Sequence, residues 1–86
     1  MKIQIDPHTL LRMEEREITE GEIEDVLTTG KAFGAKSSRL GKFKVFNYGR
    51  KRAGRVFEQK RIEVIYVREG DTLVTVTAYS FFGKWE

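Results

Sequence analysis

The segment RIEVIYVREGDTLVTVTAY, residues 61–79, consists of two alternating runs joined by the turn residues Glu69–Asp71. Both runs are rich in Val, Ile, Thr and Tyr, and this composition with a period of two predicts a β-hairpin. Alternation in the second run predicts one set of side chains that meets the core and another on the open face of the sheet. The core set is Val74, Val76 and Ala78, and the open set is Leu73, Thr75, Thr77 and Tyr79. Hydroxyl groups on an open face suit polar contacts, although Thr and Tyr are also favoured in strands for their shape alone.

Strand patterns also precede this hairpin. The segment FKVFNY at residues 43–48 predicts one strand, and RVFEQ at residues 55–59 runs into the strand at residues 61–67. The segment KIQI at residues 2–5 alternates apolar and polar residues and predicts a short first strand. Between the strands, GRKRAGR at residues 49–55 is expected to be a polar loop.

Two helices are expected between the first strand and the others. Asp6 followed by proline is typical of a helix start, and this helix should run to about residue 17. Thr19 and Glu22 match the capping box of a second helix, for which Gly30 is a natural stop. The order β-α-α-β-β-β, with room for one more strand, predicts an α+β fold whose two helices pack on one face of an antiparallel sheet. With 86 residues, the chain has room for one such domain, residues 1–86.

Composition excludes several kinds of site. The chain has no cysteine and one histidine, so neither a disulfide framework nor a thiolate metal site can form, and we expect no metal and no cofactor. No run of residues is long and apolar enough for a signal peptide or a membrane span, so we expect no contact with a membrane. These features favour the cytoplasm.

Charge is segregated along the chain. Residues 14–25 contain seven acids and one base, whereas residues 31–61 contain eleven bases and one acid. A domain with this pattern is expected to present a positive field on one side and to attract a polyanion there. The alternative is that both segments are ordinary solvated faces.

The only histidine begins a basic stripe on the first predicted helix. His8, Arg12 and Arg16 are four residues apart and therefore overlie one another on one helix face. Such a row can bind phosphate through the planar donor forks of arginine. In the alternative, the arginines pair with Glu15 or with the acidic second helix.

These pieces together resemble a bacterial domain family that is similar to RelE/ParE-type toxins and, more widely, to the metal-independent ribonucleases grouped with barnase, EndoU and colicin toxins (the BECR group). The matching residues are His8, Arg12, Arg16, Ile18, Val26, Leu27, Ile62 to Tyr66 and Val74 to Tyr79. One position departs from the pattern, because Thr9 stands where the family usually has a smaller residue after the histidine. The resemblance implies a single RelE-like domain that binds RNA, cleaves it without metal and is held in check by a cognate antitoxin.

Cleavage of this kind needs a base, an acid and fixed cations around a phosphorane. The resemblance makes His8 the candidate base and Arg12 and Arg16 the candidate phosphate clamps. Thr77 or Tyr79 would supply the second proton carrier, with Tyr79 preferred. Tyr66 and Glu58 are further candidates.

The densest group of bases is the expected contact with an RNA backbone. It consists of Lys44, Arg50, Lys51, Arg52, Arg55 and Arg61, with Lys60 nearby. An exposed loop that is basic for solubility would have the same composition. In the tail SFFGKWE, the aromatic residues either stack on bases or cap the core and dock onto a partner.

Two other functional classes fit the same residues. One is a non-catalytic module of the same fold that binds nucleic acid or protein. The other is an interaction protein that forms a homodimer through its sheet edge and aromatic tail.

Overall fold

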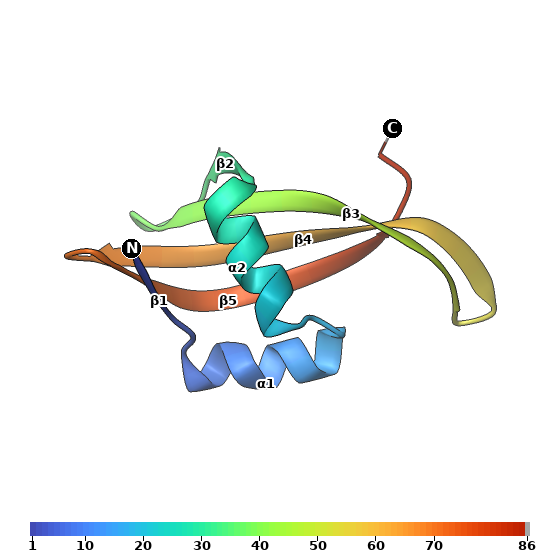
Figure 1. Ribbon diagram of the computed structural model, residues 1–86, viewed down its shortest axis with the longest axis horizontal. Helices are drawn as coiled ribbons and strands as arrows, with labels where there is room; N and C mark the ends of the chain where they lie inside the picture. The colour runs from blue at the N-terminus through green and yellow to red at the C-terminus, as the bar shows by residue number, and fades with distance from the viewer. Residues whose placement is uncertain (86) are drawn as a thin grey trace.

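The computed structural model describes residues 1–85, which form a five-stranded sheet and two helices (Figure 1). The elements are β1 (Lys2–Gln4), α1 (Pro7–Arg16), α2 (Glu20–Thr29), β2 (Lys31–Gly34), β3 (Leu40–Arg52), β4 (Arg55–Glu69) and β5 (Thr72–Gly83). The strand order is β1-β5-β4-β3-β2. Strands β2 to β5 pair antiparallel, whereas β1 pairs parallel to β5. No helix of the described residues is long and apolar enough to cross a membrane.

The α+β class predicted from the sequence is confirmed, and the sheet adds two features. Strand β2 is the additional strand for which the prediction left room, and the parallel pairing of β1 makes the sheet mixed rather than wholly antiparallel. The parallel pairing is possible because α1 and α2 and the other strands lie between β1 and β5 in the chain, so no tight hairpin has to join them.

Both helices begin with the predicted caps. The Asp6 carboxylate accepts a hydrogen bond from the backbone N–H of His8, and Pro7 occupies the first helical position of α1. The capping box of α2 is confirmed, because Thr19 and Glu22 each bind the other residue's backbone N–H.

One face of the sheet is covered by the helices, and the opposite face, which we call the open face, is not. Helix α2 packs across β3 and β4, while α1 runs beside β5 (Figure 1). The core lies between the helices and the covered face of the sheet. It contains Met13, Ile18, Ile23, Val26, Leu27, Ile62, Val64, Tyr66, Leu73 and Ala78.

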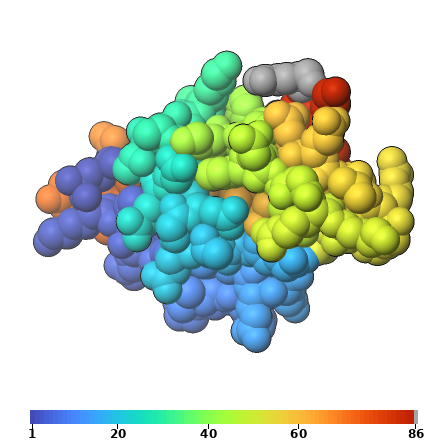
Figure 2. Space-filling view, turned by 45° about the vertical axis from the view of Figure 1, so that its right-hand side comes forward, coloured from blue at the N-terminus to red at the C-terminus, as the bar shows by residue number. Residues whose placement is uncertain are grey.

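The hairpin of β3 and β4 continues beyond the rest of the sheet. The last pair between β4 and β5 joins Gln59 to Gly83, so residues 50–52 and 55–57 pair only with each other. This projection, which we call the arm, stands out from the body of the molecule (Figure 2). It contains residues 49–57.

The expected polar loop at residues 49–55 was therefore wrong. Only Ala53 and Gly54 form the turn, and both have a positive φ, as a two-residue type I′ hairpin turn requires. The segment is polar because its two strands are mostly exposed to solvent, although they are regular strands.

Candidate functional site

The N-terminal half of α1 is fixed to β5 by a buried pair of hydroxyl groups. Thr75 accepts a hydrogen bond from the backbone N–H of Asp6 at 3.0 Å and donates its own hydroxyl to Thr9 at 2.9 Å. Thr9 and Thr75 are 0% and 2% exposed. Thr9, the residue that departs from the family pattern, is therefore a structural contact between α1 and β5.

The C-terminal end of α1 is fixed to the same strand. Arg16 donates a hydrogen bond from Nη1 to the carbonyl oxygen of Ala78 at 2.7 Å, and Ser80 donates its hydroxyl to the carbonyl oxygen of Arg16 at 2.8 Å. The Arg16 guanidinium lies 4.9 Å from the centre of the Tyr79 ring. This contact brings together two of the residues that the sequence proposed for phosphate chemistry.

The other two residues of the basic stripe, His8 and Arg12, do not lie beside Arg16 and Tyr79. Arg12 pairs with Glu15 at 2.8 Å, as in the alternative considered from the sequence. His8 is exposed at the other end of α1. An α-helix turns by about 100° per residue, so residues four apart drift by about 40°, and only the last member of the stripe reaches β5.

A β-bulge in β5 changes which side chains face the helices. Ile65 pairs with Thr77 and Tyr66 pairs with Thr75, which leaves Val76 without a partner. The predicted face of the sheet was correct for Ala78, Thr77 and Tyr79, which lie beyond the bulge. It was wrong for Leu73 and Thr75, which are buried on the covered face, and for Val74, which lies on the open face. The extra residue reverses the alternation on one side of the bulge.

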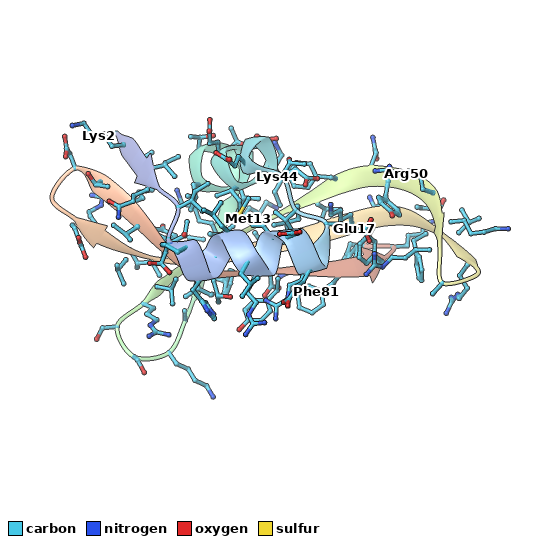
Figure 3. All side chains as sticks on the ribbon, turned by 90° about the horizontal axis from the view of Figure 1, so that it is seen from below. Lys2, Met13, Glu17, Lys44, Arg50 and Phe81 are labelled. Atoms are coloured by element: carbon cyan, nitrogen blue, oxygen red, sulfur yellow. The ribbon has the colours of Figure 1, made fainter. Side chains whose placement is uncertain are left out.

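Thr77 and Tyr79 line a hollow of about 260 Å³ on the open face. The loop between β2 and β3 forms its other wall and contributes Lys36, Ser37 and Arg39. Figure 3 shows this loop dropping below the sheet, on the side opposite α2. The hollow therefore combines two hydroxyl groups of β5 with two cations that the sequence analysis did not single out.

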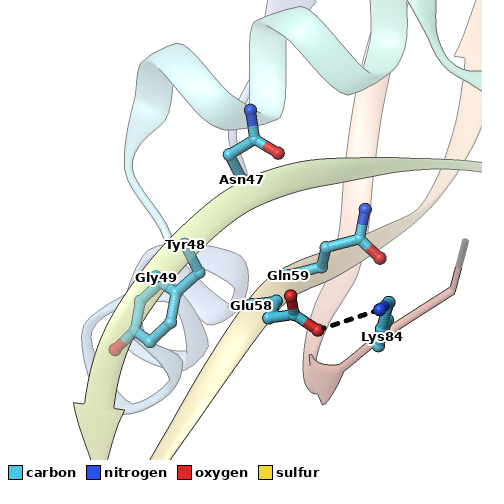
Figure 4. A pocket seen from close by; sticks show the side chains of 6 residues that line it. All are labelled: Asn47, Tyr48, Gly49, Glu58, Gln59 and Lys84. Carbon is cyan, nitrogen blue, oxygen red and sulfur yellow. Dashed lines mark ion pairs between the residues drawn. The ribbon is translucent and has the colours of Figure 1, made fainter.

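The other candidates for proton transfer lie elsewhere. Tyr66 is 6% exposed and belongs to the core, which removes it from any surface reaction. Glu58 pairs with Lys84 at 3.4 Å at the base of the arm (Figure 4). The hollow there has a volume of about 530 Å³ and opens where β3 bulges at Gly49, between the amides of Asn47 and Gln59.

Within the arm, the four predicted RNA contacts differ in their partners. Arg52 pairs with Glu17 and lies 4.3 Å from the centre of the Phe82 ring, so part of its charge is neutralised. Arg50, Lys51 and Arg55 form no ion pair within residues 1–85. Arg50 and Arg55 lie against Tyr48 and Phe57, at 4.7 and 5.2 Å from the ring centres. These three bases remain available to a polyanion.

Several bases on the covered face are matched by acids of the helices. Lys44 binds Asp25 at 2.8 Å, and the hydrogen bonds from Lys44 and Thr29 hold the pKa of Asp25 below its ordinary value. Lys60, only 4% exposed, binds Glu22 and a backbone carbonyl. Lys44 is therefore a structural residue, and the charge segregation along the chain is partly neutralised by folding.

The open face has a different composition. Its residues follow from the register, because paired residues of neighbouring strands share a face. One cross-strand row is Lys31, Phe43, Glu63 and Tyr79, and the next contains Val45, Arg61 and Phe81. Arg61 lies 3.8 Å from the centre of the Phe43 ring and donates from Nε to Glu63 at 2.9 Å. Lys44 and Phe81 point to opposite sides of the sheet (Figure 3).

Sequence analysis missed the bases that frame this face. Lys31 lies beside the end of α2, and Lys36 and Arg39 lie in a loop whose position depends on β2. The only sequence signal was the strand-like segment after Gly30, which was too short to fix a register. No cluster of three or more His, Asp or Glu side chains within residues 1–85 is arranged to hold a metal ion.

A family model described as a domain of unknown function, DUF4258, covers residues 5–80. No curated protein and no solved structure matched the chain.

Proposed function

The chain belongs to the DUF4258 family, a domain of unknown function, and we propose that it binds single-stranded RNA across the open face of its sheet. The observation that carries the proposal is the composition of this face around Phe43. Four bases stand there beside exposed aromatic rings, and Glu63 is the one acid among the described residues of these rows. The bases are Lys31, Lys36, Arg39 and Arg61.

Aromatic rings are available on this face for stacking with bases. Tyr79 and Phe81 are 40% and 45% exposed and lie nearly parallel, with ring centres 6.5 Å apart. Stacking of a nucleobase on an aromatic side chain contributes about 1–3 kcal/mol and tolerates any base. Phosphates on either side would meet Arg16, Lys36 and Arg39. The arm, with three unpaired bases, extends the positive surface and is a second place for the RNA backbone to bind.

The test is the binding of a labelled single-stranded RNA, followed by fluorescence anisotropy at several salt concentrations. With about three phosphates contacted, log K should fall against log salt with a slope of about −2. Replacing Lys36 and Arg39 together by alanine should reduce that slope by about 1.4. The matched control replaces Lys2 and Arg68 by alanine. This double substitution removes the same amount of charge, but beside the β4–β5 turn.

Equal losses in the two double variants would show that only net charge matters, and the open face would no longer be the proposed site. Affinity that does not change with salt would also contradict the proposal. Retention of affinity after replacement of both Tyr79 and Phe81 by alanine would exclude stacking.

A metal-independent ribonuclease is the second candidate, and the position of Arg16 over Tyr79 favours it. A guanidinium beside a phenol, with Thr77 and two loop cations nearby, is a suitable place to bind phosphate and move a proton. Tyr79→Phe should keep RNA binding and abolish cleavage. His8 lies about 12 Å along the helix axis from Arg16, so it would act as a base only on a phosphate bound at the N-terminal end of α1, and cleavage by a His8→Ala variant would remove it from the mechanism.

The resemblance to RelE/ParE-type toxins extends this second candidate to a toxin of the cytoplasm with an antitoxin as its partner. Growth arrest on expression, relieved by Tyr79→Phe, would support it. A domain that binds RNA without cleaving it is the non-catalytic alternative. A stable homodimer with no affinity for RNA would instead support the interaction protein.

A further inference from the structure

A third hollow lies at the edge of β3, at the point where β2 begins and beside the C-terminal tail. Its volume is about 420 Å³, which falls within the range of about 300–1,000 Å³ typical of small-molecule sites. Its walls include Lys31, Phe43, Arg61 and Trp85. We infer that this hollow, the Trp85 pocket, binds a single nucleotide of the RNA, an inference that rests on the proposed function.

Trp85 is held in place by two contacts, one of its backbone and one of its indole ring. The backbone N–H of Trp85 donates to the side-chain oxygen of Gln59 at 2.6 Å. The ring lies against Gly83, since a Cβ at that position would stand 3.6 Å from the indole. The indole is nevertheless 38% exposed, so part of it is free to stack on a base. A nucleobase could therefore stack on the exposed part of the ring without displacing another side chain.

The cations around the pocket differ in how many hydrogen bonds and ion pairs they already form within the protein. Lys44, which also lines it, is bound to Asp25 and Thr29. Arg61 uses Nε for Glu63, and its terminal nitrogens have no hydrogen-bond partner within residues 1–85. Lys31 is exposed and forms no ion pair with any described residue. Lys31 and the free edge of Arg61 are therefore the groups that would bind phosphate.

The end of α2 orients the nucleotide. Thr29 and Gly30, at the C-terminal end of α2, also line the pocket, and a helix C-terminus carries partial negative charge. That charge disfavours a phosphate and favours hydrogen-bond donors such as ribose hydroxyls. Lys31 directly follows Gly30 and offsets this charge, so the phosphate should point toward the terminal nitrogens of Arg61, with Lys31 adding positive charge nearby. An acidic peptide would use the same cations but would leave the indole unstacked.

The experiment uses Trp85 as its own reporter, because it is the only tryptophan in the chain. Adenosine monophosphate, adenosine and inorganic phosphate are each titrated against the protein while tryptophan fluorescence is recorded. The monophosphate should quench Trp85 with saturation, adenosine should bind more weakly, and phosphate alone should leave the emission unchanged. Lys31→Ala should weaken the monophosphate about two- to fivefold without affecting adenosine. Arg68→Ala, a base outside the pocket, is the control and should bind like the parent.

A parallel titration with labelled single-stranded RNA separates this inference from the proposed function. If anisotropy reports binding and the RNA leaves Trp85 emission unchanged, the pocket holds no nucleotide of the RNA and the inference fails, while the open face remains the proposed RNA surface. If neither signal changes, both proposals fail. Quenching by an acidic peptide that equals quenching by the monophosphate would also overturn the inference. If the monophosphate quenches Trp85 while the labelled RNA does not bind, the pocket takes a free nucleotide, and the inference that it holds a nucleotide of the RNA fails together with the proposed function.

Discussion

Replacing Thr75 by valine should loosen the contact between α1 and β5. The substitution keeps the shape of the side chain and removes a hydroxyl that serves Asp6 and Thr9 at once. Both hydrogen bonds are lost, and the N–H of Asp6 is left without its partner in a partly buried position. Arg16, which meets Tyr79, lies on the same helix, so loosening α1 would also affect the proposed RNA surface.

The magnitude follows from the two bonds. Each contributes about 1 kcal/mol net, and leaving a buried polar group unpaired costs about 1–3 kcal/mol. We therefore expect Thr75→Val to lower the free energy of unfolding by about 2–4 kcal/mol. Thr75→Ser keeps the hydroxyl and loses one methyl group, which should cost about 1 kcal/mol. For a domain of this size, each kcal/mol corresponds to about 4–8 °C in Tm.

Urea unfolding of four proteins measures the effect: the parent, Thr75→Val, Thr9→Val and the double variant. The double variant should be more stable than the sum of the single losses predicts, by about 1 kcal/mol, because two apolar side chains then face each other. Strict additivity would show that the two hydroxyls do not interact. A serine variant less stable than the valine variant would refute the hydrogen-bond argument and make packing the dominant effect.

Three further predictions concern stability. Gly30→Ala should lower Tm by about 5–15 °C, since its Cβ would stand 2.4 and 2.7 Å from two backbone oxygens, whereas Gly34→Ala, in open space, should have little effect. Glu17 ends α1 with a φ of 57°, which strains any residue except glycine, so urea unfolding should show Glu17→Gly to be more stable than Glu17→Ala by about 1 kcal/mol. The reverse order would show that this backbone conformation causes no strain. Asp25→Asn should destabilise at neutral pH, and because the folded pKa is lowered, the difference from the parent should shrink as pH falls below the ordinary value of 3.8; a difference independent of pH would exclude the Lys44 pair as its cause.

Local signals were sufficient to predict much of the fold. The capping box at Thr19 and Glu22 involves residues three apart, and the hairpin at residues 61–79 needs only its own alternation and turn. Gly30 was correctly expected to end α2, but for a different reason. Its φ of −74° is ordinary, and its missing side chain instead allows the end of α2 to approach β3.

The register of β5 could not be predicted in the same way. The segment TLVTVT reads as regular alternation whether or not it contains a bulge, so the sequence does not show that Val76 lacks a partner. The bulge brings Thr75 to the helix side, where it meets Thr9, 66 residues away in the chain. A contact at that separation leaves no local pattern.

The electrostatics of the candidate site depend on strand alternation more than on net charge. Lys60 and Arg61 are neighbours in β4, yet Lys60 is buried beneath the helices while Arg61 lies on the open face. The acidic segment at residues 14–25 contains the end of α1 and the first half of α2, and carboxylates of α2 neutralise bases on the covered face, Lys44 and Lys60 among them. Bases on the opposite face and in the loop after β2 have fewer acids within reach. A basic surface therefore remains on the side that also carries the exposed aromatic rings, because α2, which covers the opposite face of β3 and β4, is the acidic part of the chain.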